Sequence, residues 1–554
     1  MVRDSNKIFF LILILIIGFC YSNSLRNNFV LDDEPLVVKN PLIKSPKLFP
    51  LIFKTALYEY SEKARIRFGY NSMYRPLQLL SYALDYRIWG LNPAGYHLTN
   101  IFIHALNSIL IYSLFSLITV TPIAKIIAIL FAVHPIHTSV VSYISSRADL
   151  LAALFMLASI IFFFKFLRLN LKRFYALSLL SAGLALICRE NALTIPIFIL
   201  SALFILKPKP RKFLYCIPFI LLILAYAALR SCILGAHTLV WHPEFMNFFL
   251  RIIDFLNIVP RYISLLVLPL NLHMIRLTPF ILSLREPKVF LGIAFFLFYV
   301  YLIIRWRRDN LLLFSLSWFI IGLIPVFFML DGYPFFFQAM MAESWVYLAS
   351  AGFFAILASA IYKFKKLGII IFFILTAFYS VLTLISNTYW KHNIVVYENV
   401  LKYTSQKNPM LKNLIKEYLN HGLYLDALSA IRKFCEYYPE SSDRYLLEGD
   451  YYYKTDEIDR AINSYNTALK INKYNFQIYY NLSLCYQKLK QADKPIEYAL
   501  ESVRLNPFYL DGLVMLGDLY SREKEYALAR AYYEKAFEID PSRKDIKEKL
   551  TYAK

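Results

Sequence analysis

Two adjacent carboxylates, Asp32 and Asp33, are the residues of this sequence best suited to chemistry. They lie in "FVLDDEPLVVKNP", shortly after the first long apolar stretch. Two like charges side by side raise the pKa of at least one carboxyl group unless a cation compensates, and such pairs suit general-base catalysis. The alternative is structural, with an aspartate capping the transition from a helix to a loop. Glu34 is interpreted as a bystander.

Further polar residues in apolar surroundings form a candidate set for binding a charged substrate. Arginine matches phosphate oxygens through bidentate hydrogen bonds, and buried charges are costly unless paired or hydrated. Each residue alone could serve packing, and Arg189 with Glu190 could be a structural ion pair. Together they predict a pocket for a lipid-linked phosphate at the outer leaflet. The set is Arg75, His97, His137, Arg147, Asp149, Arg189, Glu190 and Glu343.

A metal site is not predicted. His97, Asn100 and His104 share one helical face, but this pattern supplies too few ligands for zinc. No cofactor is indicated with certainty, and dependence on a divalent metal stays open.

The elements that position these residues are membrane helices. The chain has 554 residues, is 58% hydrophobic and has a mean hydropathy of +0.48, which is too apolar for an ordinary soluble protein. Repeated apolar stretches are long enough to cross a bilayer. The net charge of +22 is attributed to cytoplasmic anchoring and not to a nucleic-acid partner. The first apolar segment favours an uncleaved first span.

Four basic clusters predict the orientation of the chain, because Lys and Arg favour the cytoplasmic side. This assignment gives about eleven spans, with the N-terminus in the cytoplasm and the C-terminal third outside. Two short helices are expected between residues 173 and 207, and a long external loop with membrane-surface helices between 231 and 288. The candidate residues then gather on the extracytoplasmic face. The clusters are residues 165–173, 207–212, 305–308 and 363–366.

The last third of the chain has a repeat period of 34 residues. Pro439, Lys473, Pro507 and Pro541 are each 34 positions apart, which is the period of tetratricopeptide repeats. The predicted architecture is therefore all-α. It combines a multi-span domain over residues 1–389, with a first external loop over 24–97, and an extracytoplasmic α-solenoid over 390–554. Such solenoids bind other molecules, but the repeats alone specify no function.

Several stretches resemble a known family. "FVLDDEPLVVKNP", "YRPLQLLSYALDYRIWGLNPAGYHLTNIFIHALN", "FAVHPIHTSVVSYISSRADLLAALF" and "CRENALTIP" are similar to the TMTC-type protein O-mannosyltransferases. These are membrane glycosyltransferases of the GT-C superfamily that carry tetratricopeptide repeats. The resemblance covers nearly the whole chain.

This resemblance implies transfer of a sugar such as mannose from a polyprenyl-phosphate carrier to a hydroxyl acceptor, with inversion. The base role would fall on Asp32 or Asp33, and the acceptor, a protein or a glycan, would be held by the repeats. The chain departs from the family pattern at Ser344, where an arginine usually follows the glutamate, so Arg75, Arg147 or Arg189 is left as the expected phosphate contact. The expected location is a bacterial inner membrane facing the periplasm, or an endoplasmic reticulum membrane facing the lumen.

Two other functions stay open at this point. A membrane scaffold would use the repeats to bind partners and the spans only as an anchor, yet an anchor needs one span and no polar pocket. A transporter of lipid-linked sugars would place polar groups throughout the membrane depth, whereas the candidates here gather at one face.

Overall fold

The computed structural model describes residues 2–58, 73–206, 210–235, 248–329, 338–404, 408–491, 493–540 and 543–552. The repeat position Pro541, part of the predicted loop 24–97 and the start of the basic cluster 207–212 lie outside the described residues. The chain divides into two units. The membrane unit contains the described residues within 1–34, 50–57 and 74–392, and the repeat unit contains those within 35–49, 58–73 and 393–554.

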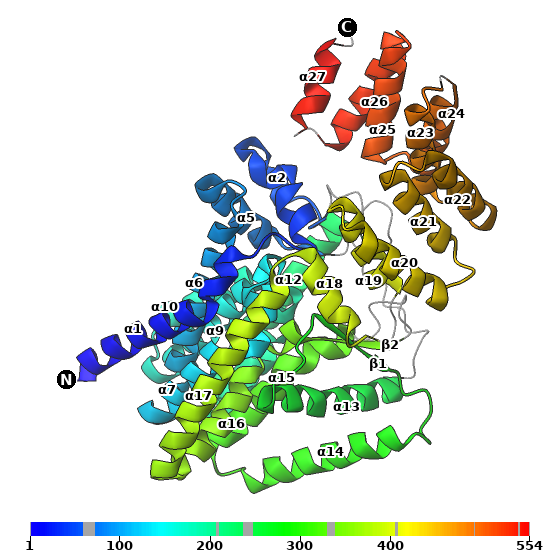
Figure 1. Ribbon diagram of the computed structural model, residues 1–554. Coiled ribbons are helices and arrows are strands. Elements are labelled where there is room, and N and C mark those ends of the chain that lie inside the picture. The colour runs from blue at the N-terminus through cyan, green and yellow to red at the C-terminus, as the bar shows by residue number, and fades with distance from the viewer. Residues whose placement is uncertain are drawn as a thin grey trace. The chain divides into compact units, whose positions relative to one another are not determined.

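The membrane unit is a helical bundle whose centre is formed by α6, α7, α9, α15 and α16 (Figure 1). Proline at the first turn and asparagine caps begin several helices; the Asn92 side chain, for example, accepts from the backbone N–H of Ala94. The bounds are α1 (Val2–Tyr21), α5 (Pro76–Trp89), α6 (Pro93–Phe115), α7 (Thr121–Val133), α8 (Thr138–Val141), α9 (Arg147–Leu169), α10 (Lys172–Leu186), α11 (Ile195–Leu206), α12 (Ile217–Leu234), α13 (Phe248–Val267), α14 (Pro287–Arg305), α15 (Asn310–Met329), α16 (Ser350–Lys363) and α17 (Lys365–Asn387).

Within the described residues, one small two-stranded sheet accompanies the helices. Strands β1 (Ile275–Pro279) and β2 (Gln338–Ala342) pair antiparallel, with Ile275 opposite Ala342. Apart from this pair, the predicted all-α multi-span architecture with C-terminal repeats is confirmed. The α13 helix carries an internal proline, Pro260, and buries Ile258, Tyr262 and Leu266 along one side.

The described residues contain seven helices long and apolar enough to cross a membrane, or eight if one bent pair counts as a single span. The predicted count of about eleven is not confirmed. The α7 helix stops before His134, and the chain bends by 51° between Thr121–Val133 and Pro135–Val141. The residue before a proline disfavours helical backbone, which accounts for this break. The apolar segments Glu190–Ile205 and Ser350–Lys363 are shorter than a full span.

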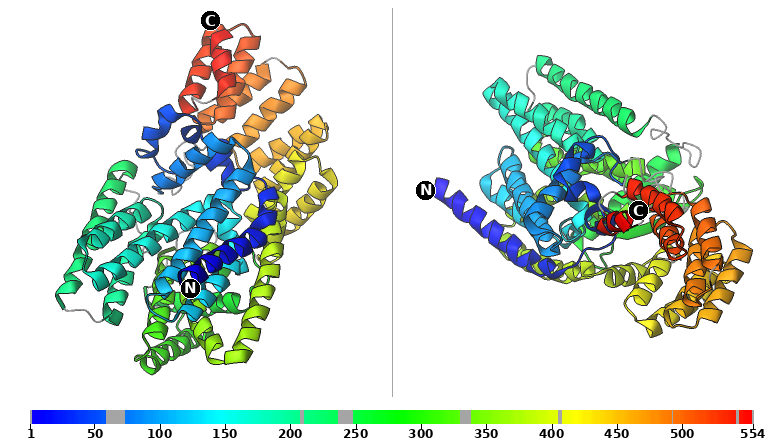
Figure 2. Two further views of the ribbon diagram at one scale, coloured as in Figure 1. Left: turned by 90° about the vertical axis from the view of Figure 1, so that its left-hand side faces the viewer. Right: turned by 90° about the horizontal axis from the view of Figure 1, so that it is seen from above.

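Large apolar side chains on α12, α14 and α17 face outward. Leu221, Leu224, Phe290, Leu291 and Phe373 are among those more than half exposed. An apolar outer surface of this size suits contact with lipid chains. Figure 2 shows α1 and α12 on the outside of the bundle, and Figure 1 shows α14 at its edge.

The repeat unit consists of paired antiparallel helices, as the 34-residue period predicts. Pro439, Lys473 and Pro507 each lie two residues beyond the ends of α20, α22 and α24. The helices are α18 (Asn393–Leu401), α19 (Asn408–Asn420), α20 (Tyr424–Tyr437), α21 (Ser442–Lys454), α22 (Ile458–Ile471), α23 (Phe476–Lys488), α24 (Asp493–Leu505), α25 (Leu510–Arg522), α26 (Tyr526–Ile539) and α27 (Lys544–Tyr552).

Two contacts repeat within this unit. A Cβ added to Gly517 would lie 2.3 Å from the ring of Tyr533, and one added to Gly449 would lie 2.5 Å from the ring of Tyr465. Both tyrosine hydroxyls donate to the aspartate that follows the glycine, Asp518 at 2.7 Å and Asp450 at 2.8 Å. The glycine therefore allows the tyrosine of the second helix to pack against the first.

We expect Gly517→Ala to destabilise the last repeat by about 1–3 kcal/mol, because the added methyl group overpacks this contact. Hydrogen exchange of amides in α25 and α26 in the full chain measures the effect. Arg522→Ala, an exposed change on the same helix, serves as the control. Unchanged exchange in Gly517→Ala would show that the ring relocates freely.

Candidate functional site

A short turn between α8 and α9 contacts several of the polar residues of the membrane unit. We call residues 143–149 the central turn. The α5 helix fixes its backbone: Gln78 Nε2 donates to the Ser145 carbonyl at 2.8 Å, and Tyr82 Oη donates to the Ile144 carbonyl at 2.9 Å. All of these groups are buried. The turn therefore has a fixed conformation. Its side chains contact the loop that carries Asp32 and Asp33, here called the acidic loop, and the charged residues described below.

The two candidate acids differ sharply in their surroundings. Asp33 is 1% exposed, and its carboxylate accepts from the Val30 N–H at 2.9 Å and from the N–H of Ser145 at 2.7 Å, as well as from the Ser145 hydroxyl. Asp32 is partly exposed, and its backbone N–H donates to the Tyr143 hydroxyl at 3.2 Å. Asp33 thus anchors the loop to the central turn, while the Asp32 side chain is the more accessible carboxylate.

Burial raises the pKa of Asp33 to about 7, opposed by the hydrogen bonds from Ser145 and Val30 and assisted by the charge of Asp32. The folded protein therefore retains a proton that the unfolded chain releases near pH 4. We expect this contribution to stability to be complete below about pH 4 and lost as the pH rises through 7. Burial also raises the pKa of Glu343 to about 7, so the contribution of Glu343 to stability likewise falls as the pH rises.

Unfolding midpoints of the purified protein in detergent at pH 5 and pH 8 measure this dependence. Asp33→Asn is expected to lower the overall stability by about 1–3 kcal/mol, since an amide cannot accept all of these bonds, and to reduce the pH dependence without abolishing it, because Glu343 remains. A pH dependence as steep in Asp33→Asn as in the wild type would contradict the assignment.

Arg147 is enclosed by partners and has no exposed side-chain surface. Its Nη1 lies 2.6 Å from Asp85 Oδ2, its Nε donates to Asn100 Oδ1 at 2.7 Å, and its Nη2 donates to the Tyr96 carbonyl at 2.9 Å. Its guanidinium carbon lies 4.7 Å from the centre of the Tyr82 ring. These contacts tie α5, α6 and α9 together, so the structure gives Arg147 a role in holding the central turn.

Four other charges form a second cluster beside the turn. Arg75 donates from Nε at 3.1 Å and from Nη2 at 2.8 Å to Glu190 Oε2, and Arg189 pairs with Asp149. The two pairs lie close enough for Arg75 and Glu190 to affect Asp149 electrostatically. Two positive and two negative groups leave the cluster neutral, and the Glu190 side chain is the most exposed of the four at 21%.

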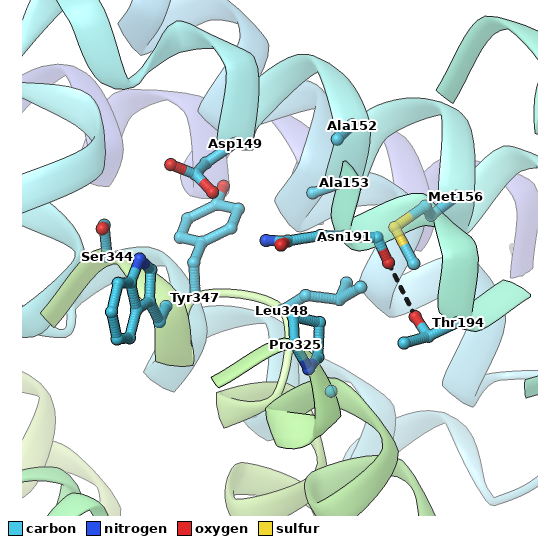
Figure 3. A pocket seen from close by; sticks show the side chains of 12 residues that line it. Asp149, Ala152, Ala153, Met156, Asn191, Thr194, Pro325, Ser344, Tyr347 and Leu348 are labelled. Atoms are coloured by element: carbon cyan, nitrogen blue, oxygen red, sulfur yellow. Dashed lines mark hydrogen bonds between the residues drawn. The ribbon is translucent and has the colours of Figure 1, made fainter. Parts of the chain in front are cut away.

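A small cavity of about 20 Å³ adjoins this cluster (Figure 3). Asp149 lines it together with Asn191 and Tyr347, which come from different elements, and the Thr194 hydroxyl donates to the Asn191 carbonyl at 2.8 Å. Ser344, the position at which the sequence departs from the family pattern, also lines it. The cavity is therefore lined by residues from three segments: the "CREN" segment (residues 188–191), the central turn and the segment after β2.

The remaining candidates do not pair with the four charges of the second cluster. His137 is fully buried between the Phe131 carbonyl, 2.8 Å from Nδ1, and the Ser350 hydroxyl, 3.0 Å from Nε2. His97 is buried on α6. Glu343 accepts from the His273 N–H at 2.7 Å and from Arg276 Nη2 at 3.0 Å. The structure thus places Glu343 in its own ion pair.

The sequence analysis did not identify three residues that pair with or hold the candidates. Asp85 pairs with Arg147, Arg276 pairs with Glu343, and Ser145 holds Asp33. The sequence does indicate that Asp85 is paired, because a carboxylate in the apolar helix "LSYALDYRIW" requires a cation. Nothing in the sequence indicates the contacts of Arg276 and Ser145, since these depend on strand pairing and on the conformation of a turn. The described residues contain no group of three His, Cys, Asp or Glu side chains that could hold a metal ion.

Comparison with known proteins supports both parts of the chain. A family model described as "TPR repeat" matches residues 449–490, and one described as "Tetratricopeptide repeat" matches residues 476–509 and 510–543. The protein O-mannosyl-transferase F38B6.6 of Caenorhabditis elegans is 29% identical over 75% of this chain and 61% of its own length. The human protein O-mannosyl-transferase TMTC3 is 24% identical over 96% of this chain and 64% of its own length.

These matches confirm the resemblance to the TMTC-type protein O-mannosyltransferases along nearly the whole chain, and they confirm the repeats. The chain spans less than two thirds of the length of either relative. Among solved structures, a crystal structure of MamA is 28% identical over 27% of this chain and 86% of its own, with a TM-score of 0.23.

Proposed function

We propose that this chain is a membrane glycosyltransferase that moves a sugar from a polyprenyl-phosphate carrier to a hydroxyl group of an acceptor protein. The names of its relatives, protein O-mannosyl-transferases, favour mannose as the sugar. The observation that carries the proposal is the central turn. It holds the acidic loop through Tyr143 and Ser145 and the charged cluster through Asp149.

In this proposal Asp32 is the general base. Its carboxylate removes the proton of the acceptor hydroxyl while the hydroxyl oxygen attacks the sugar C1, and the bond from C1 to the phosphate oxygen breaks. The displacement is in line and inverts the anomeric centre. Asp33 holds the loop in place through Ser145. A base must lie within hydrogen-bond reach of the proton it takes, which the partly exposed side chain of Asp32 allows better than the enclosed Asp33.

Arg75 and Arg189 are proposed to stabilise the departing polyprenyl phosphate. Guanidinium groups bind phosphate oxygens in a bidentate manner, and stabilising the charge of a leaving group is a large contribution to catalysis. Glu190 and Asp149 orient the two arginines in the absence of substrate. Arg147 is assigned a structural role and not phosphate binding, because its guanidinium group is fully enclosed.

The repeat unit is proposed to hold the acceptor. A cavity of about 290 Å³ there is lined by Lys416, Asp450, Lys454 and Asn481, among others. Asp450 accepts from Asn481 Nδ2 at 2.7 Å, which fixes the amide at the cavity wall. Amide and lysine side chains suit hydrogen bonding to an extended polypeptide. Following the positive-inside rule, we place this unit and the acidic loop on the extracytoplasmic side.

Photolabelling tests donor binding. A polyprenyl-phosphate sugar with a photoreactive group next to the phosphate is expected to label residues of the "CREN" segment or the central turn, and excess unlabelled donor should suppress the label. Arg189→Met is expected to reduce labelling about tenfold or more, and Arg173→Met, an exposed change at the start of α10, should not. Labelling confined to other segments, or insensitive to competitor, contradicts the proposal and favours a scaffold.

A further inference from the structure

The Asn387 side chain, at the last residue of α17, joins three segments of the membrane unit. It is fully buried. Its Nδ2 donates to the Cys20 carbonyl at 2.8 Å and to Asn23 Oδ1 at 2.7 Å, and its Oδ1 accepts from the Ser142 hydroxyl at 2.7 Å. Both N–H groups and the oxygen of this amide are therefore used, and they connect the end of α1, the segment before the central turn and the end of α17.

The backbone around Asn387 adds bonds to the chain that leads into the acidic loop. Asn27 Nδ2 donates to the Asn387 carbonyl at 3.0 Å, and the Asn28 N–H donates to the Lys391 carbonyl at 2.9 Å. These two residues precede Asp32 by only five and four positions. The start of the loop is thus fixed to the end of α17.

An aromatic contact makes a second connection. The rings of Tyr143 and Trp390 stack with centres 5.0 Å apart and planes inclined by 14°. The Tyr143 hydroxyl accepts from the backbone N–H of Asp32. The residue before Tyr143 is Ser142, which donates to Asn387. Asp32 is therefore linked to the end of α17 through Asn387 and to the short segment that follows this helix through Trp390.

The loop needs such support because its backbone is strained. Leu31, immediately before Asp32, has a φ of +52°. Residues with a side chain adopt this left-handed region at a cost, and they persist there only where the surrounding structure imposes it. The conformation that presents Asp32 is thus set by contacts from outside the loop.

We propose that Asn387 is a positioning residue for Asp32, which fixes the acidic loop against the central turn. This inference rests on the proposed function in so far as Asp32 acts as the base. Misplacing a reacting group by about 1 Å can reduce a rate by about 100-fold. Asn387 does not touch the substrate in this proposal, and its effect is transmitted through Ser142, Asn23 and the loop.

The test compares Asn387→Asp, which removes both N–H donors at constant volume, with a matched control on the same helix. Thr383→Val is the control: Thr383 is also fully buried, lies one turn earlier on α17, and donates to the Val133 carbonyl at 2.6 Å. In Asn387→Asp, amides of residues 28–33 should exchange with solvent at least tenfold faster. Sugar transfer should fall about 100-fold in kcat, with the KM for the lipid-linked donor unchanged.

Thr383→Val should remain within about threefold of the wild type in both measurements, because it removes one hydrogen bond outside the loop. Ser142→Ala removes the hydroxyl that donates to Asn387 Oδ1, a contact that Asn387→Asp retains. It should also speed the exchange of residues 28–33, and it decides the question if Asn387→Asp does not accumulate. Unchanged exchange in the loop, or equal losses in Thr383→Val, would overturn the inference. Absence of transfer by the wild type contradicts the proposed function instead, and the exchange data still decide whether Asn387 fixes the loop.

Discussion

Replacing Asp32 with asparagine is expected to reduce sugar transfer by about 1000-fold while leaving the protein folded. A general base contributes about 10²–10⁴-fold to a rate, and an amide cannot accept the proton of the acceptor hydroxyl. The contact that Asp32 makes with Tyr143 uses the backbone N–H, which the substitution retains. Initial rates at saturating donor and acceptor measure the effect on kcat.

Two neighbouring substitutions make this result specific. Glu34→Gln changes the next acid and is expected to stay within about threefold of the wild type. Asp33→Asn is expected to reduce transfer per folded molecule by less than Asp32→Asn, about 100-fold at most, because its carboxylate positions the loop through Ser145 and Val30 and takes no proton from the acceptor. A loss in Glu34→Gln equal to that in Asp32→Asn would move the base to a different residue, and full activity of Asp32→Asn would exclude Asp32.

Arg147→Met is expected to cause the largest loss of stability, about 3–5 kcal/mol, because it leaves the buried carboxylate of Asp85 without its cation. It also removes the donors to Asn100 and to the Tyr96 carbonyl. The midpoint of thermal unfolding in detergent and the fraction of monodisperse protein measure this loss.

The control is Arg87→Met, which changes an exposed arginine on α5, the helix that also carries Asp85. The double variant Asp85→Leu/Arg147→Met should recover part of the stability, since replacing both members of a buried pair removes the unpaired charge. If Arg147→Met were as stable as Arg87→Met, Arg147 would be available for substrate and the assignment of phosphate binding to Arg75 and Arg189 would be incomplete.

Much of the architecture follows from the sequence, because it depends on short-range patterns. Apolar length predicted the membrane helices, and the 34-residue spacing predicted where α20, α22 and α24 end. The number of spans did not follow. Hydropathy does not register the break that Pro135 imposes after α7, nor the shortness of α11 and α16.

The candidate site was predictable in its residue types but not in its pairings. Charged groups in apolar segments had to find partners, and the structure places Asp33, Arg147, Asp149 and Arg189 at or beside the central turn. Their separate roles depend on burial that the sequence does not reveal. Asp32 and Asp33 are equivalent in a sequence, whereas in the structure Ser145 encloses one and leaves the other accessible.

The most direct measurement of the central claim is product analysis with purified protein. Wild-type chain and Asp32→Asn are incubated with polyprenyl-phosphate mannose and an acceptor protein, and mass spectrometry follows both the acceptor and the lipid. We predict that the wild type adds a hexose to acceptor hydroxyl groups, releases polyprenyl phosphate and inverts the anomeric configuration, and that Asp32→Asn does none of these above background. Transfer at the same rate by both proteins, or no transfer by the wild type from any lipid-linked sugar, would contradict the account.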